Sequence, residues 1–348
     1  MKIGIRSMAS LHVKTFFSIH EIDAAAWDKL GGQLPFQSHR WYAFGERVMA
    51  DCAPVYLLVY DMHTLVARAS MWLVRNEPLP KMSRFVRILV QALLKRRPLF
   101  VCRSPMANAS GVMVENSLER RGILTLLTEA AIAEGRHRRA SIVLFDFLDE
   151  REAQDWPSDS VRVNMPSPGT ILKNRWQSLE EYLADGNKKD RQHYKRSLRE
   201  AQKLGIFLSQ HQAVPDIDTA MDLIRKVESR YSSSHNPWTR SLLENIKTIQ
   251  GTWLEAHMGE KLVGCGLIVE DNNAQMTTAL GLADNIPYVY FLLVYASLET
   301  AFNKKVSLLR WGSGAYEVKQ KLGFELEKNN NSVLFGTNRL IRLLNKII

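Results

Sequence analysis

The stretch RWGSGAYEVKQKLGFE, residues 310–325, joins an apolar run to a short helix through a glycine-rich turn. The residues SLLR that lead into it are typical of a strand. Loops at strand ends often carry functional residues. Glycine lets the backbone come close to a bound group, so Gly312, Ser313 and Gly314 are candidates for binding a donor molecule.

Two side chains that follow the turn could act on a substrate. Lys319 is three residues from Tyr316, which is itself three residues from Ser313, so the three could share one helix face toward the turn. A lysine in that position can stabilise an oxyanion, or neutralise a phosphate or a carboxylate. The alternative is a simple strand-to-helix turn with exposed lysines.

The two halves of the chain show the same order of elements. In the second half, a three-stranded antiparallel meander spans 252–284, a long helix spans 287–303 and a closing strand spans 331–337. The first half also reads as antiparallel strands, a helix and one more strand. Because 348 residues exceed a single ordinary core, we expect two tandem α/β (α+β) domains, 1–170 and 171–348, each with a mostly antiparallel sheet.

The predicted helix 187–204 concentrates positive charge on one face. At 100° per residue, its cations fall on one arc, opposite Tyr194, Leu198 and Ala201. That arc comprises Lys188, Arg191, Lys195, Arg196, Arg199 and Lys203. One interpretation is a solvated basic face. The other is a surface for a phosphate chain or an RNA backbone, with Lys188, Arg191, Lys195 and Arg196 as binding residues.

The chain as a whole is basic, with a formal net charge of +10. An excess of positive charge favours polyanionic partners, such as nucleic acid, phosphorylated molecules or anionic lipid. Residues 81–103 carry seven basic side chains and no acidic one, with apolar residues between them. This segment is either a surface that touches a membrane or polyanion, or a cationic loop and helix packed on a sheet.

Cysteine and histidine spacing gives no sign of a disulfide framework or a metal site. Cys52, Cys102 and Cys265 are far apart, and we expect them to be structural in a reducing compartment. The histidines are scattered, so no metal ligand set is predicted. The N-terminal residues lack an uninterrupted apolar run, and no window is apolar enough to span a membrane, which together predict a cytoplasmic protein.

Two segments resemble one family. SLEEYLADGNKKDRQHYKRSLREAQKLGIFL, residues 178–208, is similar to the start of the second domain in the BioF2-like, Fem-type branch of the GNAT N-acyltransferases. GSGAYEVKQKLGF, residues 312–324, resembles the end of that domain. The likeness covers 171–337, whereas residues 16–150 only suggest a degenerate first copy of the fold.

This resemblance implies transfer of an acyl or aminoacyl group to an amine. The donor would be acyl-CoA or aminoacyl-tRNA, used as a co-substrate with no tightly bound cofactor. The amine would attack directly, with Lys319 stabilising the oxyanion, Lys321 as its rival and Tyr316 orienting the substrate or relaying a proton. The site would lie in the second domain near the domain cleft, with Trp238, Tyr288 and Trp311 lining the pocket.

One departure from the family bears on the donor. GNAT enzymes that use acetyl-CoA usually carry Q/R-x-x-G-x-G/A before the helix that follows the meander. This chain has DNIPYVYFLL there, without glycine, and Pro287 removes an amide donor. Residues 119–124 in the first half match only the glycine of that motif. The departure favours an acyl donor carried on tRNA, or CoA bound in another way than by this motif. The alternative function is a non-catalytic basic module that binds RNA or anionic membrane.

Overall fold

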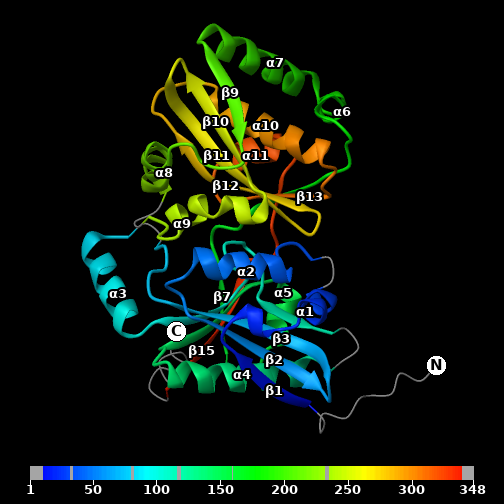
Figure 1. Ribbon diagram of the computed structural model, residues 1–348, viewed down its shortest axis with the longest axis vertical. Helices are drawn as coiled ribbons and strands as arrows, with labels where there is room; N and C mark the ends of the chain where they lie inside the picture. Colours follow the sequence, from blue (N-terminus) through cyan, green and yellow to red (C-terminus); the bar gives the residue numbers. More distant parts are fainter. Residues whose placement is uncertain are drawn as a thin grey trace, which may run out of the picture. The chain divides into compact units, whose positions relative to one another are not determined.

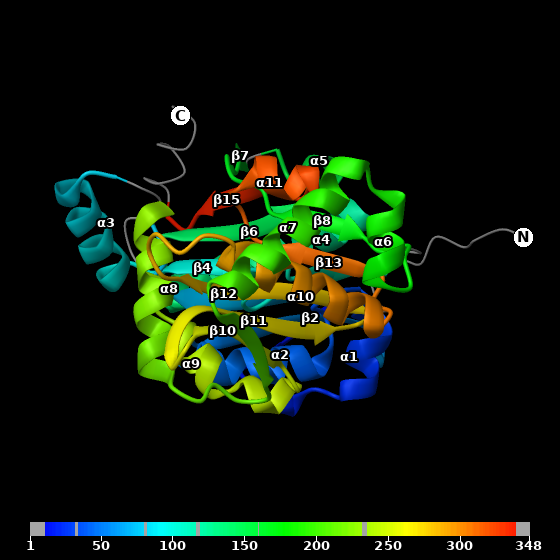
Figure 2. The same cartoon turned by 90° about the horizontal axis from the view of Figure 1, so that it is seen from above.

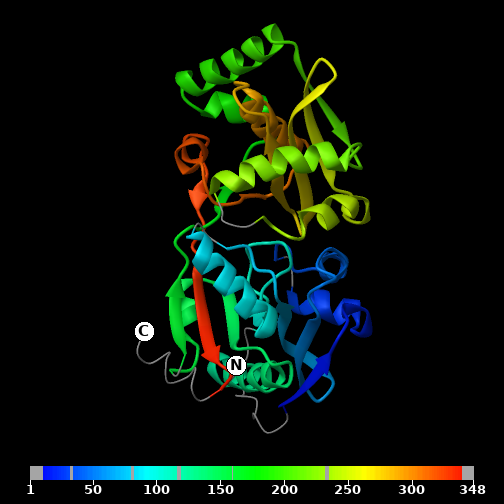
Figure 3. The ribbon, with the colours of Figure 1, turned by 90° about the vertical axis from the view of Figure 1, so that its left-hand side faces the viewer.

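The computed structural model describes residues 11–31, 34–79, 82–115, 119–158, 160–231 and 235–338. The chain forms two compact units (Figure 1). The first unit contains residues 1–77, 83–168 and 327–348, and the second contains 78–82 and 169–326. Each unit is an open sheet with helices on its faces (Figure 3).

The first sheet has the strand order β1-β2-β3-β4-β6-β15-β7, and β5 pairs with β3. Its strands are β1 (Leu11–Phe16), β2 (Pro54–Asp61), β3 (Thr64–Val74), β4 (Leu99–Cys102), β5 (Val112–Val114), β6 (Ile142–Leu148), β7 (Val161–Asn164) and β15 (Asn331–Gly336). The helices of this unit are η2 (Ile19–Glu21), α1 (Ala24–Gly31), α2 (His39–Val48), α3 (Arg84–Arg96), α4 (Arg120–His137) and α5 (Glu150–Gln154).

The second sheet has the order β9-β10-β11-β12-β13-β8-β14. Its strands are β8 (Thr170–Lys173), β9 (Ile206–His211), β10 (Thr252–Met258), β11 (Lys261–Asp271), β12 (Ala274–Leu282), β13 (Leu308–Trp311) and β14 (Glu325–Leu326). The helices are α6 (Leu179–Asp185), α7 (Lys188–Lys203), α8 (Ile217–Tyr231), α9 (Thr239–Glu244), η3 (Ile246–Ile249), α10 (Val289–Asn303) and α11 (Tyr316–Lys321).

The seven strands that follow one another across the first sheet correspond in order to those of the second, and β5 has no counterpart there. Each sheet contains one parallel pair, β4 with β6 and β12 with β13, and its other pairs are antiparallel. In each unit a helix, α4 or α10, connects the two parallel strands. The prediction of two tandem α/β units with mostly antiparallel sheets is confirmed.

The last strand does not belong to the unit that the sequence pattern indicates. We predicted that 331–337 closes the second domain, which is wrong: β15 pairs with β6 and β7 in the first sheet. Val333 and Phe335 are buried there, and Phe335 packs against Phe145 and Trp156. In the second sheet the same position, between β13 and β14, is taken by β8. The first unit therefore depends on a strand from the C-terminal end of the chain.

Close packing of α10 on the second sheet explains one glycine of the meander. A β-carbon at Gly264 would overlap the Val289 side chain at the start of α10, so only glycine allows this approach. The other side of α10 packs against α7, where Tyr194 contacts Tyr295. Because both sides are covered, α10 is apolar nearly all round.

Candidate active site

The parallel strand β13 ends before its partner β12 does. Their pairing runs from Ala274 with Leu308 to Thr277 with Trp311, where β13 stops. β12 continues to Leu282 and contains Ala279 in the left-handed region, at φ 49°. Since the ends of parallel strands lie at the same edge of a sheet, the turn after β13 and the segment that leads into α10 emerge together. Residues that bind a substrate commonly lie at such an edge.

The turn after β13 is held by Lys319. Gly314 has φ 85° and Ala315 has φ 47°, so the chain reverses through two left-handed residues before α11 begins. The Lys319 side chain is only 6% exposed, and its Nζ donates to the carbonyl oxygen of Gly312 at 2.5 Å. The Thr170 hydroxyl donates to the carbonyl oxygen of Trp311 at 3.1 Å. A buried ammonium group therefore lies against the backbone of the turn.

The other residues predicted on this stretch are placed as follows. Ser313 and Lys321 are exposed, and Tyr316 is half-buried at the first position of α11. Trp311 is buried and stacks on Phe324, with ring centroids 4.6 Å apart. Of the two lysines, Lys319 is thus the one whose amine is oriented by the turn.

Two other aromatic residues were predicted to line a pocket. Trp238 is buried at the start of α9, a helix that packs against α8. Tyr288 is half-buried and precedes α10 with φ 69°. Like Trp311, Trp238 contributes to packing, whereas Tyr288 reaches the surface at the start of α10.

The cationic face of α7 is present, but its members differ. Arg191 is half-buried, and its Nη1 donates to the carbonyl oxygens of Leu183, Ala184 and Gly186 at the end of α6. Arg199 and Lys203 lie within 3.4 Å and 3.1 Å of Glu200, and the hydrogen bond from Lys203 lowers the pKa of that carboxyl. Within the described ranges, Lys188, Lys195 and Arg196 form no hydrogen bond or ion pair. Of the six cations predicted on this face, these three are exposed and available to an anionic ligand.

The buried side of α7 contains a histidine, His193, that the sequence pattern does not single out. His193 Nδ1 lies 3.1 Å from the Tyr295 hydroxyl, and its ring contacts Phe291 with centroids 4.3 Å apart. Phe291 belongs to the first turn of α10. Burial, helped by the charge of Arg196, lowers the pKa of His193, while burial raises the pKa of Tyr295 to about 12. The lowered pKa thus favours the neutral form of the His193 imidazole, which lies beside the start of α10.

The buried face of α7 is rotated slightly from the predicted one, which is why His193 was not predicted to lie on it. We expected Tyr194, Leu198 and Ala201 on the buried side, but Leu198 is 40% exposed and Ser197 is buried instead. The buried line passes through His193, Ser197 and Ala201, spaced four residues apart. That spacing was a signal in the sequence, but polar residues at two of the three positions concealed it.

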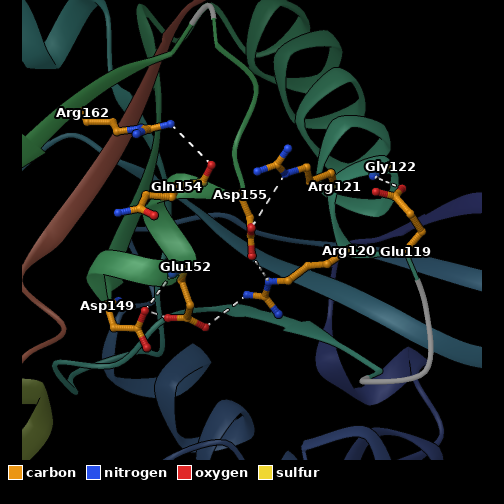
Figure 4. A network of polar contacts seen from close by, with 9 residues as sticks. All are labelled: Glu119, Arg120, Arg121, Gly122, Asp149, Glu152, Gln154, Asp155 and Arg162. Carbon is orange, nitrogen blue, oxygen red and sulfur yellow. Dashed lines mark hydrogen bonds and ion pairs between the residues drawn. The ribbon is translucent and has the colours of Figure 1, made fainter.

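The corresponding helix start in the first unit is occupied by the chain itself (Figure 4). The Glu119 side chain accepts a hydrogen bond from the Gly122 amide at 2.5 Å at the N-terminus of α4. Arg120 contacts Glu152 at 3.1 Å and Asp155 at 3.3 Å. In contrast, no side chain caps α10 in the second unit. The two helix starts therefore differ: a carboxylate of the chain caps α4, whereas α10 has no side-chain cap.

In the described ranges, no three His, Cys, Asp or Glu side chains are grouped so that they could hold a metal ion. None of the helices described has both the length and the apolar character needed to cross a bilayer.

Comparisons with known proteins agree with this arrangement. Residues 18–346 match the model of the FemAB-like family, described as peptidoglycan biosynthesis/recognition. No curated protein matches the chain.

Among solved structures, a tandem GNAT protein from the clavulanic acid biosynthesis pathway matches with a TM-score of 0.59 and 13% identity, over 94% of this chain and 99% of that chain. FemX matches with a TM-score of 0.58 and 10% identity, over 95% of this chain and 100% of the FemX chain. The C-terminal domain of a putative lysylphosphatidylglycerol synthetase from Agrobacterium fabrum matches with a TM-score of 0.53 and 10% identity, over 95% and 96%. At these identities the structural matches show the fold, which is the tandem GNAT fold. Because the family model spans nearly the whole chain, the protein belongs to the FemAB-like family of acyltransferases.

Proposed function

We propose that the protein transfers an acyl or aminoacyl group from an activated carrier to an amine, at the carboxyl edge of β12 and β13. The observation that supports this most directly is the buried Lys319 ammonium, placed against the Gly312 carbonyl in the turn after β13. A positive charge held beside a reacting carbonyl stabilises the oxyanion that forms there.

The proposed step needs no covalent enzyme intermediate. The neutral amine attacks the carbonyl carbon of the thioester or ester, and the carbonyl oxygen becomes an oxyanion beside Lys319. Collapse of this tetrahedral intermediate forms the amide and breaks the bond to the thiol of CoA or the ribose hydroxyl of tRNA. The proton lost by the amine passes through the Tyr316 hydroxyl to that leaving group.

The carrier is proposed to bind along α7 at the start of α10. Lys188, Lys195 and Arg196 supply positive charge there without internal partners among the described residues. Pro287 and the left-handed Tyr288 precede α10 in place of a glycine-rich loop. This arrangement favours aminoacyl-tRNA, or CoA whose phosphates are held by side chains rather than by backbone amides.

A donor screen tests the proposal. Acyl-CoAs and aminoacylated tRNAs are offered in turn, and binding is followed by the melting temperature, which a ligand selective for the folded state raises. Donors that bind are then tested for transfer to amines. Acyl transfer that is lost when Lys319 is replaced supports the proposal that the protein is an enzyme. If a carrier binds without transfer, and binding depends on Lys195 and Arg196 but not on Lys319, the protein is a binding module instead.

A further inference from the structure

The helix α3 exposes an unusual number of large apolar side chains. Phe85, Leu89 and Leu93 are 77%, 60% and 56% exposed, and Val86 and Ile88 are exposed as well. Leu94 is the one buried residue of this helix. Figures 1 and 2 show α3 at the margin of the first unit. The sequence left open whether this segment packs on a sheet, and the structure shows that most of its apolar surface does not.

These apolar residues form one face of the helix. At 100° per residue, Ile88, Phe85, Leu89, Leu93 and Val86 cover a continuous arc of roughly 160°. The opposite side holds Val90, Gln91 and Leu94, which are half-buried or buried against the protein. The exposed arc is thus a surface of the folded unit rather than part of its core.

Positive charges border this face. Arg84 and Lys95 lie at one margin of the arc and Arg97, just after the helix, lies at the other. Arg96, in the last turn, projects within the arc itself, where a long side chain can carry its charge toward the phosphate level. All four side chains are exposed. The sequence contains no acidic residue from Pro78 to Val114 to offset them. An apolar stripe with cationic margins is the pattern of a helix that lies in the plane of a membrane interface.

We propose that α3 docks the protein on an anionic lipid bilayer, with Phe85, Leu89 and Leu93 in the acyl boundary and the four cations at the phosphate level. A second copy of the chain fits less well, because two such helices would bring eight positive charges together. RNA would pair with the cations but leave the apolar stripe in water. Anionic lipid satisfies both halves of the surface. This docking surface is independent of the transferase site.

Vesicle flotation tests the inference with the full chain. Vesicles of phosphatidylcholine that contain about 30% phosphatidylglycerol should bind the protein, whereas phosphatidylcholine alone should bind it at least roughly tenfold less. The variant Phe85→Ser, Leu89→Ser, Leu93→Ser should lose at least about tenfold in partitioning. The variant Arg84→Gln, Lys95→Gln, Arg96→Gln should lose binding to anionic vesicles to a similar extent. All six side chains are exposed, so the melting temperature should hardly change.

A label reports insertion directly. The three native cysteines are buried and burial raises the pKa of each thiol, so an environment-sensitive dye should react at an introduced cysteine. The dye on Leu89→Cys should shift to the blue and be quenched by spin-labelled lipid. The matched control is Met62→Cys, which is 70% exposed at the β2–β3 turn and should show neither effect.

Three outcomes would overturn the proposal. One is vesicle binding that the serine variant leaves intact. It would indicate that the cations attract phosphates without insertion of the helix, and RNA would bind in the same way. Another is a vesicle-independent dimer, seen by sedimentation velocity, that the serine variant dissociates. The third is equal labelling signals at positions 62 and 89 with anionic vesicles.

Discussion

The Lys319 ammonium lies 2.5 Å from the carbonyl oxygen of Gly312, seven residues earlier in the chain. This bond ties α11 back to the turn at the end of β13, so the lysine both shapes the turn and places a cation beside it. A residue with two such roles can be tested only by measurements that separate turnover from folding.

Lys319→Met should lower the turnover of the transfer reaction by about 10²–10³ while changing donor binding little. The reason is that a cation that meets charge only in the tetrahedral intermediate acts mainly on the transition state. Steady-state kinetics with a donor found in the screen give kcat and KM separately. The control is Lys321→Met on the same helix, whose side chain is exposed and should be dispensable.

Lys319→Arg distinguishes the two roles of the lysine. A planar guanidinium can still reach the Gly312 carbonyl but does not replace a compact ammonium at the oxyanion, so stability should recover more than turnover. If Lys319→Met keeps normal turnover and merely weakens the donor, the lysine is a phosphate anchor and the oxyanion role is wrong.

Gly314→Ala should be more harmful than Gly312→Ala. Both positions have open space for a β-carbon, but only Gly314 has a left-handed backbone, at φ 85°. An alanine there should cost about 1 kcal/mol in unfolding free energy, whereas the same change at Gly312 should be close to neutral. Urea denaturation of the two variants measures the difference. Equal losses would show that the turn is sensitive to side chains rather than to backbone conformation.

Lys195→Ala and Arg196→Ala should each weaken donor binding and reduce its salt dependence. If the carrier is a tRNA, each lost phosphate contact should lower the slope of log Kd against log salt by about 1. The matched control is Arg199→Ala, on the same helix but beside Glu200, where the loss should be smaller. Arg191→Ala should instead lower stability, because its guanidinium binds three carbonyl oxygens at the end of α6. Identical effects of all four changes would argue against a defined phosphate site.

His193 should report donor binding through its titration. Its pKa in the free protein lies below the ordinary value of about 6.5, because burial disfavours the imidazolium. Phosphates held by Arg196 and Lys195 would favour the imidazolium, so the donor should raise this pKa, and affinity should increase as pH falls through it. Proton NMR of the His193 imidazole measures its titration in the free protein and in the donor complex, with His257 on β10 as the control. An unchanged His193 pKa in the saturated complex would place the donor elsewhere.

Deleting residues 327–348 should destabilise the first unit rather than the second. The deletion removes β15, with Val333 and Phe335 from the core and the hydrogen bond from the Ser332 hydroxyl to Asp146 at 2.6 Å. The loss should be about 3 kcal/mol or more, from the two buried side chains alone. Amide hydrogen exchange should show lost protection in β6 and β7. The control deletion of 339–348 leaves β15 in place, and lost protection centred on β13 would contradict the strand assignment.

Local features of the chain follow from the sequence. The α7 helix begins where Asn187 and Asp190 form a capping box, and it ends at Lys203, two residues before Gly205 with φ 68°. Ser178 caps α6, with the Glu181 amide donating to its hydroxyl at 3.2 Å. The meander over 252–284 was also predicted correctly, because periodicity and capping depend on near neighbours.

Relationships between distant residues were decided only by the tertiary structure. β15 joins a strand that precedes it by more than 180 residues, and His193 meets Tyr295 across 102 positions. The cost of closing a loop grows slowly with its length, so separation in sequence hardly constrains which partner is chosen. The choice of partner depends on how much apolar surface each strand pairing buries. The alternation of polar and apolar residues within one strand does not reveal that quantity. For the same reason the apolar residues of α3 were compatible with a core position, and only the folded chain shows that its own sheet leaves them exposed.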